Sequence, residues 1–370
     1  METAGLDYDL PARAIAQHPV EPRSSARLLV DAGPGRPPEH RTVADLPGLV
    51  GPGDLLVVNT TRVLPARLHL RKATGGAAEV LLLERLGDGA WEALVRPGRR
   101  LPPGTRLVPA ASAGSAAGQA AALVVEVGEV LGEDGRRLVR LHTGADAADA
   151  SAGPAAEGAD GPTVRDAELA ALDRHGAVPL PPYITEPLAD PGRYQTVFAD
   201  RPGSVAAPTA GLHLTDAVLA GCRAAGAEVA TVELVVGLGT FRPIATDKVE
   251  DHTMHGERYV VPEATLAACR EARRVVAVGT TVVRALESAA ASGSLEGRTE
   301  LFIRRPWPWR VVDALLTNFH MPRSSLLVLV DAFVGPRWRD LYATALADGY
   351  RFLSFGDAML LTRTEGVAAP

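Results

Sequence analysis

The hydrophobic pattern changes partway along the chain, and this change limits the folds that the sequence can adopt. Between residues 66 and 142 the apolar residues form short runs rich in Val and Leu, separated by turns such as Gly87-Asp88-Gly89. Such runs predict strands at residues 66–70, 78–86, 91–95, 105–108, 123–130 and 136–142. Because no helical pattern interrupts them, they predict a small antiparallel β-barrel of about 80 residues.

The second half instead alternates strands with helices that carry start and stop signals. Thr215 is placed to cap a helix that stops before Gly226, and residues 228–236 follow as a strand. Pro262 suits the first position of a helix that reaches Arg274. Residues 275–278 then read as a buried strand.

Three more helices are predicted towards the C-terminus. Thr280 or Thr281 caps a helix at 282–291, and Ser324 or Ser325 caps an apolar helix that ends at Gly335. The last helix covers residues 338–347. The predicted fold class is therefore α/β: an α/β main domain at residues 1–66 and 152–370, with an inserted β-barrel domain at 67–151. Two low-complexity stretches, 110–122 and 144–161, lack large apolar residues and predict mobile loops.

The charge balance gives no sign of a general nucleic-acid binder. The 370 residues include 38 basic and 44 acidic side chains, a formal net charge of −6. Lys72 and Lys248 are the only lysines in the sequence. A polyanionic partner would therefore have to meet a local basic patch.

The sequence also predicts a reduced, cytoplasmic protein. No apolar run reaches the ~18–20 residues that a bilayer span needs, and the N-terminal residues contain no apolar signal segment. Cys222 and Cys269 are isolated and lack a C-x-x-C spacing. Nothing in the sequence requires more than a monomer.

Four segments rich in small and polar residues lie near the ends of predicted strands, where α/β folds place their ligands. The first spans residues 203–213 and contains Thr209, Gly211 and His213. Its small residues would let a ligand approach the backbone, the following helix N-terminus favours an anion, and His213 can exchange a proton. A tight loop with a structural histidine is the alternative.

The second segment, residues 236–242, contains Gly237, Gly239 and Thr240. It lacks the third glycine and the following helix of a dinucleotide-binding motif, so it is either a turn or a ligand-approach loop.

The third segment has the spacing His252, His255 and Glu257. These residues could supply metal ligands, act in proton transfer, or be structural.

The fourth segment is the turn Gly279-Thr280-Thr281, with Arg284 one helical turn later. Backbone N–H groups at such a helix start can bind a carboxylate or phosphate, although an ordinary capped helix start has the same pattern. Asn318, in the loop at 317–320, belongs beside this segment.

These blocks together resemble the S-adenosylmethionine:tRNA ribosyltransferase-isomerase family of queuosine synthesis. The matching text includes GDLLVVNTTRVLPARL, RYQTVFADRPGSVAAPTAGLHLT, VGLGTFRPI, HTMHGERY, VVAVGTTVVRALES and VDALLTNFHMPRSSLLVLVDAF. It extends along the whole chain apart from the low-complexity stretches.

The resemblance implies an α/β domain with an inserted barrel and a transferase reaction on tRNA. In that reaction the ribosyl part of S-adenosylmethionine is transferred to a 7-aminomethyl-7-deazaguanine at the wobble position and rebuilt, giving epoxyqueuosine-tRNA, while adenine and methionine leave. The implied partners are S-adenosylmethionine and the tRNA anticodon arm, with no membrane, no metal and no cofactor beyond this co-substrate.

Candidate roles follow from the chemistry that this reaction needs. His213, His255 and Glu257 are candidates for proton transfer, and Thr209 and Asn318 for positioning. The turn at 279–281 with Arg284 is the candidate seat for the methionine carboxylate. The other candidate contacts to the co-substrate are Gly211, Gly237, Gly239 and Thr240. The candidate RNA contacts are Arg62, Arg67, Arg304 and Arg305, followed by Arg96, Arg99, Arg100 and Arg310.

The chain departs from the family pattern at several motif positions. Thr60 replaces an Asp, Val235 a His and Gly256 a Ser; Glu186 lies where an Arg is usual, and Arg305-Pro306-Trp307 replaces Tyr-Pro-Gly. These departures keep three alternatives open: a relative that uses S-adenosylmethionine with a different acceptor, such as a small molecule; a non-catalytic binding module; and a metal hydrolase.

Overall fold

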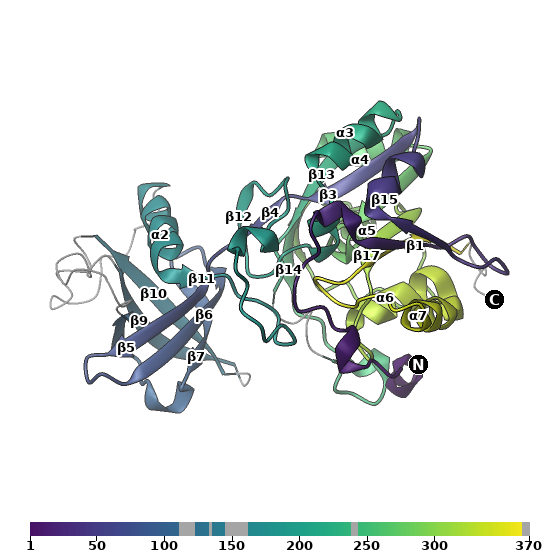
Figure 1. Cartoon of the computed structure of the whole chain (residues 1–370). Helices are drawn as coiled ribbons and strands as arrows, with labels where there is room; N and C mark the ends of the chain where they lie inside the picture. Colours follow the sequence, from purple (N-terminus) through teal and green to yellow (C-terminus); the bar gives the residue numbers. More distant parts are fainter. Residues whose placement is uncertain (111–122, 133–134, 145–161, 238–242, 365–370) are drawn as a thin grey trace. The chain divides into compact units, whose positions relative to one another are not determined.

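A computed structural model describes residues 1–110, 123–132, 135–144, 162–237 and 243–364 (Figure 1). Internal contacts divide the chain into two compact units. The larger unit comprises Met1–Arg62, Leu180–Arg201 and Ala206–Pro370, and the smaller one comprises Val63–Pro179 and Pro202–Val205. Almost all of the two low-complexity stretches lies outside the described residues.

The smaller unit contains the predicted barrel. Its strands are β5 (Arg67–Lys72), β6 (Ala77–Arg85), β7 (Trp91–Arg96), β8 (Thr105–Pro109), β9 (Leu123–Leu131) and β10 (Arg136–Thr143). They pair in the order β5-β6-β7-β10-β9-β8, and a β5–β8 pairing closes the barrel. In β5, Leu68 and Leu70 are buried whereas His69 and Arg71 are exposed, which is the alternation of a barrel wall.

One helix of the smaller unit lies outside the predicted barrel boundaries. Helix α2 (Pro162–His175) packs on β5 and β10 and leads into β11 (Gly176–Ala177), which pairs with β5. Leu172 is fully buried there. The sequence division assigned residues from 152 onwards to the α/β domain, whereas internal contacts place α2 with the barrel.

The larger unit is built on a nine-stranded mixed sheet. The strand order is β16 (Glu296–Thr299), β14 (Glu257–Val260), β13 (Glu228–Leu234), β3 (Asp54–Asn59), β15 (Arg274–Val278), β17 (Ala314–Asn318), β18 (Ala358–Thr362), β1 (Arg27–Val30) and β2 (Glu39–Thr42). The four central strands β13, β3, β15 and β17 are parallel to one another. Their carboxyl ends therefore meet at one edge of the sheet. A separate two-stranded sheet pairs β4 (Thr61–Val63) with β12 (Arg201–Ser204).

Both faces of the central sheet are covered, as the apolar run in β3 indicates. Leu55 and Val57 belong to one buried cluster, and Leu56 and Val58 to another. The helices of this unit are α3 (Asp216–Ala224), α4 (Glu263–Glu271), α5 (Thr280–Ser292), α6 (Ser325–Val334) and α7 (Trp338–Ala347). The predicted α/β class with an inserted small barrel is confirmed (Figure 1). No helix in the described parts of the chain is long and apolar enough to cross a membrane.

The helix caps agree with the sequence at two positions and differ at two. Thr215 accepts a hydrogen bond from Val218 N (3.2 Å), and Ser324 accepts one from Leu327 N (3.3 Å), as predicted. The prediction of a threonine cap on α5 was wrong, because the N-cap is Gly279, with φ of 94° and no side-chain cap. Helix α4 ends at Glu271 rather than at residue 274, because β15 already begins there.

Glu287 on α5 fixes the segment that leads into β17. This carboxylate is fully buried and accepts hydrogen bonds from the indole N–H of Trp307 (3.1 Å) and from the backbone N–H groups of Arg310 (3.1 Å), Val311 (3.0 Å) and Val312 (3.2 Å). Four donors therefore depend on one side chain.

We expect Glu287→Ala to lower the free energy of unfolding by about 2 kcal/mol or more, because buried N–H groups would lose their acceptor. Urea unfolding measures the change. The exposed Glu296→Gln is the control and should leave stability within ~0.5 kcal/mol. A Glu287→Ala protein as stable as the control would contradict this role.

Candidate active site

Polar side chains gather where the central parallel strands end. Asn59 is the last residue of β3, and Asn318 is the last residue of β17. Gly279 directly follows β15. Ligands of open α/β sheets bind outside this carboxyl edge, so these residues mark the candidate active site.

Two adjoining hollows open at this edge. The space in them, counted with the open solvent above, is about 410 and 390 Å³, and both are lined by Thr209, Asn318, His320 and Leu326. Gly279, Thr280 and Thr281 line only the first hollow, and Tyr183 and Ser354 line only the second. Three of the four residues of this shared wall, Thr209, Asn318 and His320, carry polar side-chain groups, in hollows whose lining is otherwise largely apolar.

A chain of hydrogen bonds leads from this wall to His213, which lines neither hollow. The Thr209 hydroxyl donates to Asn318 Oδ1 (2.9 Å), and Asn318 Nδ2 donates to His213 Nε2 (3.0 Å). Thr209 and His213 are the ends of a short 3-10 helix, η7 (Thr209–His213). The structure thus brings together three of the residues singled out in the sequence.

The orientation of the Asn318 amide determines the tautomer of His213. Asn318 Nδ2 also points at the carbonyl oxygens of Leu353 (3.2 Å) and Asp357 (3.4 Å), which accept only from the NH₂ side of the amide. His213 Nε2 must therefore accept, and the imidazole proton resides on Nδ1. Nε2 of His213 is consequently occupied rather than available as a base.

Burial keeps two histidines neutral here. Burial, aided by Arg351 and Arg23, lowers the pKa of His213 to about 4, and burial lowers the pKa of His320 to about 3. His320 Nε2 is bonded to the Thr317 hydroxyl (2.9 Å), and its ring lines both hollows. The sequence did not single out His320 as a catalytic candidate, although its position after Asn318 in the 317–320 loop was a signal.

The Gly279-Thr280-Thr281 turn forms the floor of the first hollow. The first intrahelical hydrogen bond of α5 comes from Val282 N to Gly279 O (3.2 Å), so the N–H groups of Thr280 and Thr281 precede it. The positive end of the helix dipole therefore faces a site lined by small residues.

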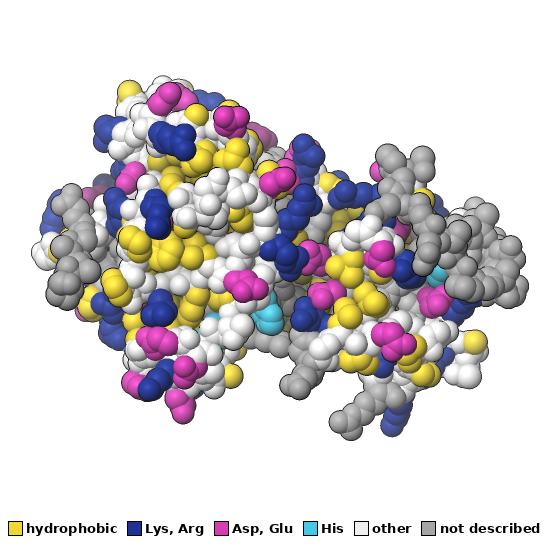
Figure 2. Space-filling view, turned by 180° about the vertical axis from the view of Figure 1, so that it is seen from behind, with side chains coloured by type: hydrophobic (Ala, Val, Ile, Leu, Met, Phe, Trp, Pro, Cys, Tyr) yellow, Lys and Arg dark blue, Asp and Glu magenta, His cyan; other side chains and the backbone are white. Residues whose placement is uncertain are grey.

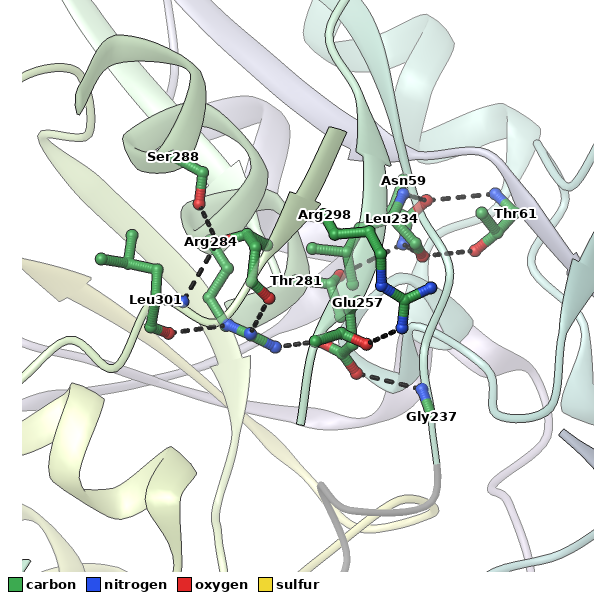
Figure 3. Close-up of polar contacts among 12 residues, drawn as sticks. Asn59, Thr61, Leu234, Gly237, Glu257, Thr281, Arg284, Ser288, Arg298 and Leu301 are labelled. Carbon is green, nitrogen blue, oxygen red and sulfur yellow. Dashed lines mark hydrogen bonds and ion pairs between the residues drawn. The ribbon is translucent and has the colours of Figure 1, made fainter. Parts of the chain in front are cut away.

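Arg284 contributes to a different, buried cluster (Figure 3). Its guanidinium pairs with the Glu257 carboxylate and donates to the carbonyl oxygens of Leu301 (3.2 Å) and Thr299 (3.2 Å). Burial lowers the pKa of Arg284 to about 10, so it remains charged at neutral pH. Glu257 also accepts from Gly237 N (3.0 Å), and both charged side chains are buried.

This cluster changes the roles that the sequence suggested for Arg284 and Glu257. With its guanidinium bonded to Glu257 and two carbonyls, Arg284 holds β14 and β16 against α5 and does not extend the anion seat at 279–281. Glu257 is likewise an ion-pair partner and does not line either hollow.

Asn59 joins the strand ends on the other side (Figure 3). It donates to Leu234 O (3.0 Å) and Thr281 Oγ1 (3.3 Å), and its Oδ1 accepts from Leu234 N (3.2 Å) and Thr61 N (3.1 Å). This amide fixes β13 and the start of α5 relative to β3. The sequence placed it in a matching motif without giving it a role.

The His252, His255 and Glu257 segment does not form a metal site. His255 is exposed, His252 packs edge-on against Phe302, and Glu257 is buried with Arg284. Among the residues that the structure describes, no group of three or more His, Cys, Asp or Glu side chains is arranged to hold a metal ion.

The glycines of the candidate loops differ in their roles. A Cβ on Gly211 would lie 2.7 Å from the ring of Phe198, so this glycine permits close packing of η7 rather than approach of a ligand. Gly237 N is bonded to Glu257. Gly239 and Thr240 lie outside the described residues.

Of the eight candidate RNA contacts, three are paired with carboxylates in the portion of the chain that the structure describes. Arg67 pairs with Glu79 (3.2 Å), Arg304 with Glu250 (3.7 Å) and Arg305 with the buried Asp331 (2.6 Å). Arg62 is exposed. Both basic and acidic side chains are spread over the face drawn in Figure 2.

Sequence comparison identifies one family across nearly the whole chain. The model of the family described as "Queuosine biosynthesis protein" matches residues 3–361.

Curated relatives match over almost their full length. A protein of Rubrobacter xylanophilus is 51% identical over 362 residues, covering 98% of each chain, and one of Thermus thermophilus is 49% identical, covering 96% of this chain and 98% of the relative. Both are named S-adenosylmethionine:tRNA ribosyltransferase-isomerase. A crystal structure of S-adenosylmethionine tRNA ribosyltransferase from Thermotoga maritima shares 34% identity, covers 96% of this chain and 99% of that one, and has a TM-score of 0.50.

The buried histidines predict an acid-sensitive larger unit. Above pH 6.5 a histidine is neutral in both the folded and unfolded states; between pH 6.5 and about 4 only the unfolded state takes up the proton, so stability falls as the pH falls. Each histidine contributes a slope of up to about 1.4 kcal/mol per pH unit.

Urea unfolding at pH 7, 6 and 5 measures this slope. The free energy of unfolding of His320→Gln should fall less steeply with falling pH than that of the native chain. The exposed His255→Gln is the control and should show the native slope. Equal slopes for native and His320→Gln proteins would contradict a neutral His320.

Proposed function

The chain belongs to the queuosine biosynthesis protein family, and on that premise we propose that it is an S-adenosylmethionine:tRNA ribosyltransferase-isomerase. It transfers the ribosyl part of S-adenosylmethionine to the 7-aminomethyl-7-deazaguanine at the tRNA wobble position, and isomerises it. The products are epoxyqueuosine-tRNA, adenine and methionine. Family membership over residues 3–361 is the observation that carries this function.

The polar groups of the shared wall suit the sugar and amino groups of the co-substrate. Because the Thr209 hydroxyl donates its proton to Asn318, it presents only lone pairs to the hollow. A ligand group beside Thr209 must therefore be a donor, such as a ribose hydroxyl or the methionine ammonium.

The start of α5 suits the methionine carboxylate. The N–H groups of Thr280 and Thr281 and the helix dipole favour an anion, and Gly279 leaves room for it. Since Arg284 is bonded elsewhere, backbone groups rather than a guanidinium form this seat.

His320 is the proton-transfer residue that the geometry favours. The C–H next to the sulfonium is acidic, and its removal needs an unprotonated base that reaches the hollow. His320 is neutral at physiological pH and lines both hollows. When His320 Nε2–H donates to Thr317, Nδ1 carries the accepting lone pair. His213 acts through Asn318 as a positioning residue.

The remaining expectations concern the partners. The chain acts as a monomer on the anticodon arm of tRNA, and it needs no metal or cofactor beyond S-adenosylmethionine.

Adenine release tests the proposed function. The chain is incubated with S-adenosylmethionine and EDTA, with and without tRNA that carries the aminomethyl-deazaguanine, and adenine is followed by chromatography. We expect release only when the modified tRNA is present. Release without tRNA would favour a different acceptor, and no release under any condition would exclude the transferase.

The same assay tests His320. We expect His320→Gln to lower kcat for adenine release by about 100-fold, the usual effect of removing a general base, with little change in S-adenosylmethionine affinity. His252→Gln is the matched control, since His252 packs on Phe302 outside the hollows and should keep near-native kcat. A His320→Gln enzyme with native kcat would remove His320 from the chemistry.

A further inference from the structure

Two segments of the barrel carry basic residues without acidic neighbours in sequence. Residues 70–78 and 93–110 contain no Asp or Glu. They do contain basic residues: Arg71, Lys72, Arg96, Arg99, Arg100 and Arg106.

The barrel brings these two segments together. The first is the β5–β6 hairpin, closed by a hydrogen bond from Lys72 N to Gly76 O (2.9 Å). The second follows β7 through the short 3-10 helix η5 (Gly98–Arg100). Lys72 Nζ donates to the carbonyl oxygen of Arg100 (2.8 Å), so the hairpin and the η5 segment lie side by side.

Other arginines of the barrel are neutralised by carboxylates. Arg67 pairs with Glu79 (3.2 Å), Arg136 with Glu92 (2.9 Å) and Arg140 with Asp88 (2.7 Å). Further pairs are Arg85 with Glu168 (2.8 Å) and Arg106 with Glu126 (3.5 Å).

Arg71, Arg96 and Arg100 differ from these residues. All three are exposed, and none forms an ion pair with a carboxylate among the described residues. Glu79 lies opposite Arg96 in the β6–β7 register, but its carboxylate is bonded to Arg67. The guanidinium groups of Arg71, Arg96 and Arg100 therefore remain without carboxylate partners where the β5–β6 hairpin and the η5 segment meet. The strand register places the β9–β10 hairpin at the same end of the barrel; it contributes the exposed Glu129, and its Glu133 and Asp134 lie outside the described residues.

We propose that this end of the barrel, formed by Arg71, Lys72, Arg96 and Arg100, binds the phosphodiester backbone of the tRNA substrate. The proposal rests on the proposed function and adds the surface that meets the RNA. Exposed guanidinium groups bind phosphate oxygens well, and unpaired ones do so without first breaking an internal ion pair.

The candidate RNA contacts that already form ion pairs are expected to bind phosphate less well than these unpaired residues. Arg67, Arg304 and Arg305 would each have to give up a carboxylate to bind RNA. Lys72 fixes the η5 segment through the Arg100 carbonyl, which reduces the ordering that binding would otherwise require.

Salt-dependent tRNA binding by the full-length chain tests the surface. The test variant is Arg71→Gln/Arg96→Gln/Arg100→Gln. The matched control is Arg67→Gln/Arg136→Gln/Arg140→Gln, which removes the same number of charges from the same barrel but from ion-paired positions. Filter binding is measured from about 50 to 200 mM salt, the range over which phosphate contacts weaken most visibly, and circular dichroism melting verifies folding.

The test variant should bind tRNA about 10-fold more weakly, with a salt slope smaller by about 2, because fewer counterions are released. The control should keep the native slope, and both variants should bind S-adenosylmethionine as the native chain does.

Three results would overturn the proposal. If both variants bind tRNA as tightly as the native chain, the RNA lies elsewhere and the proposed function is unaffected. If the control loses as much affinity as the test variant, general charge rather than this surface binds RNA. If the native chain binds no tRNA, the proposed function fails with it.

Discussion

The carboxamide of Asn318 is bonded to two segments that are far from it and from each other in sequence, η7 and residues 353–357. Its oxygen accepts from Thr209, and its nitrogen donates to His213 and to the backbone of Leu353 and Asp357. An amide can do this because it has both donors and acceptors. As the last residue of β17, Asn318 therefore fixes the loops that surround the carboxyl edge of the sheet.

A similar arrangement recurs two strands away. Asn59 ends β3 and bonds to β13 and to Thr281 at the start of α5. Between the two amides lie the hollow and the helix start that we assign to the co-substrate. The edge is thus organised by neutral groups, and the nearby ion pair of Glu257 and Arg284 is buried in the support of α5. Neutral histidines fit this environment, because burial disfavours their charged form.

Much of the fold was predictable because its signals are local. The six barrel strands follow from short apolar runs between turns, and the caps at Thr215 and Ser324 follow from a hydroxyl before an apolar helix. Helix α2 was assigned to the wrong unit because its burial depends on the barrel surface, which no local pattern reveals. The candidate site was only partly predictable. The sequence singled out Thr209, His213 and Asn318. Their hydrogen bonds, however, join residues more than 100 positions apart, so the sequence could not show which of them bonds to which. The sequence does not show whether an arginine forms an ion pair. The carboxylate partners of Arg284, Arg67 and Arg305 are therefore known only from the tertiary structure.

Hydrogen exchange with and without S-adenosylmethionine tests the assignment of the hollow most directly. Bound co-substrate should slow amide exchange in residues 207–213, 279–283 and 317–321, and it should leave the barrel strands unchanged. Protection confined to other segments of the larger unit, or protection of the barrel alone, would contradict the placement of the co-substrate at the Asn318 edge.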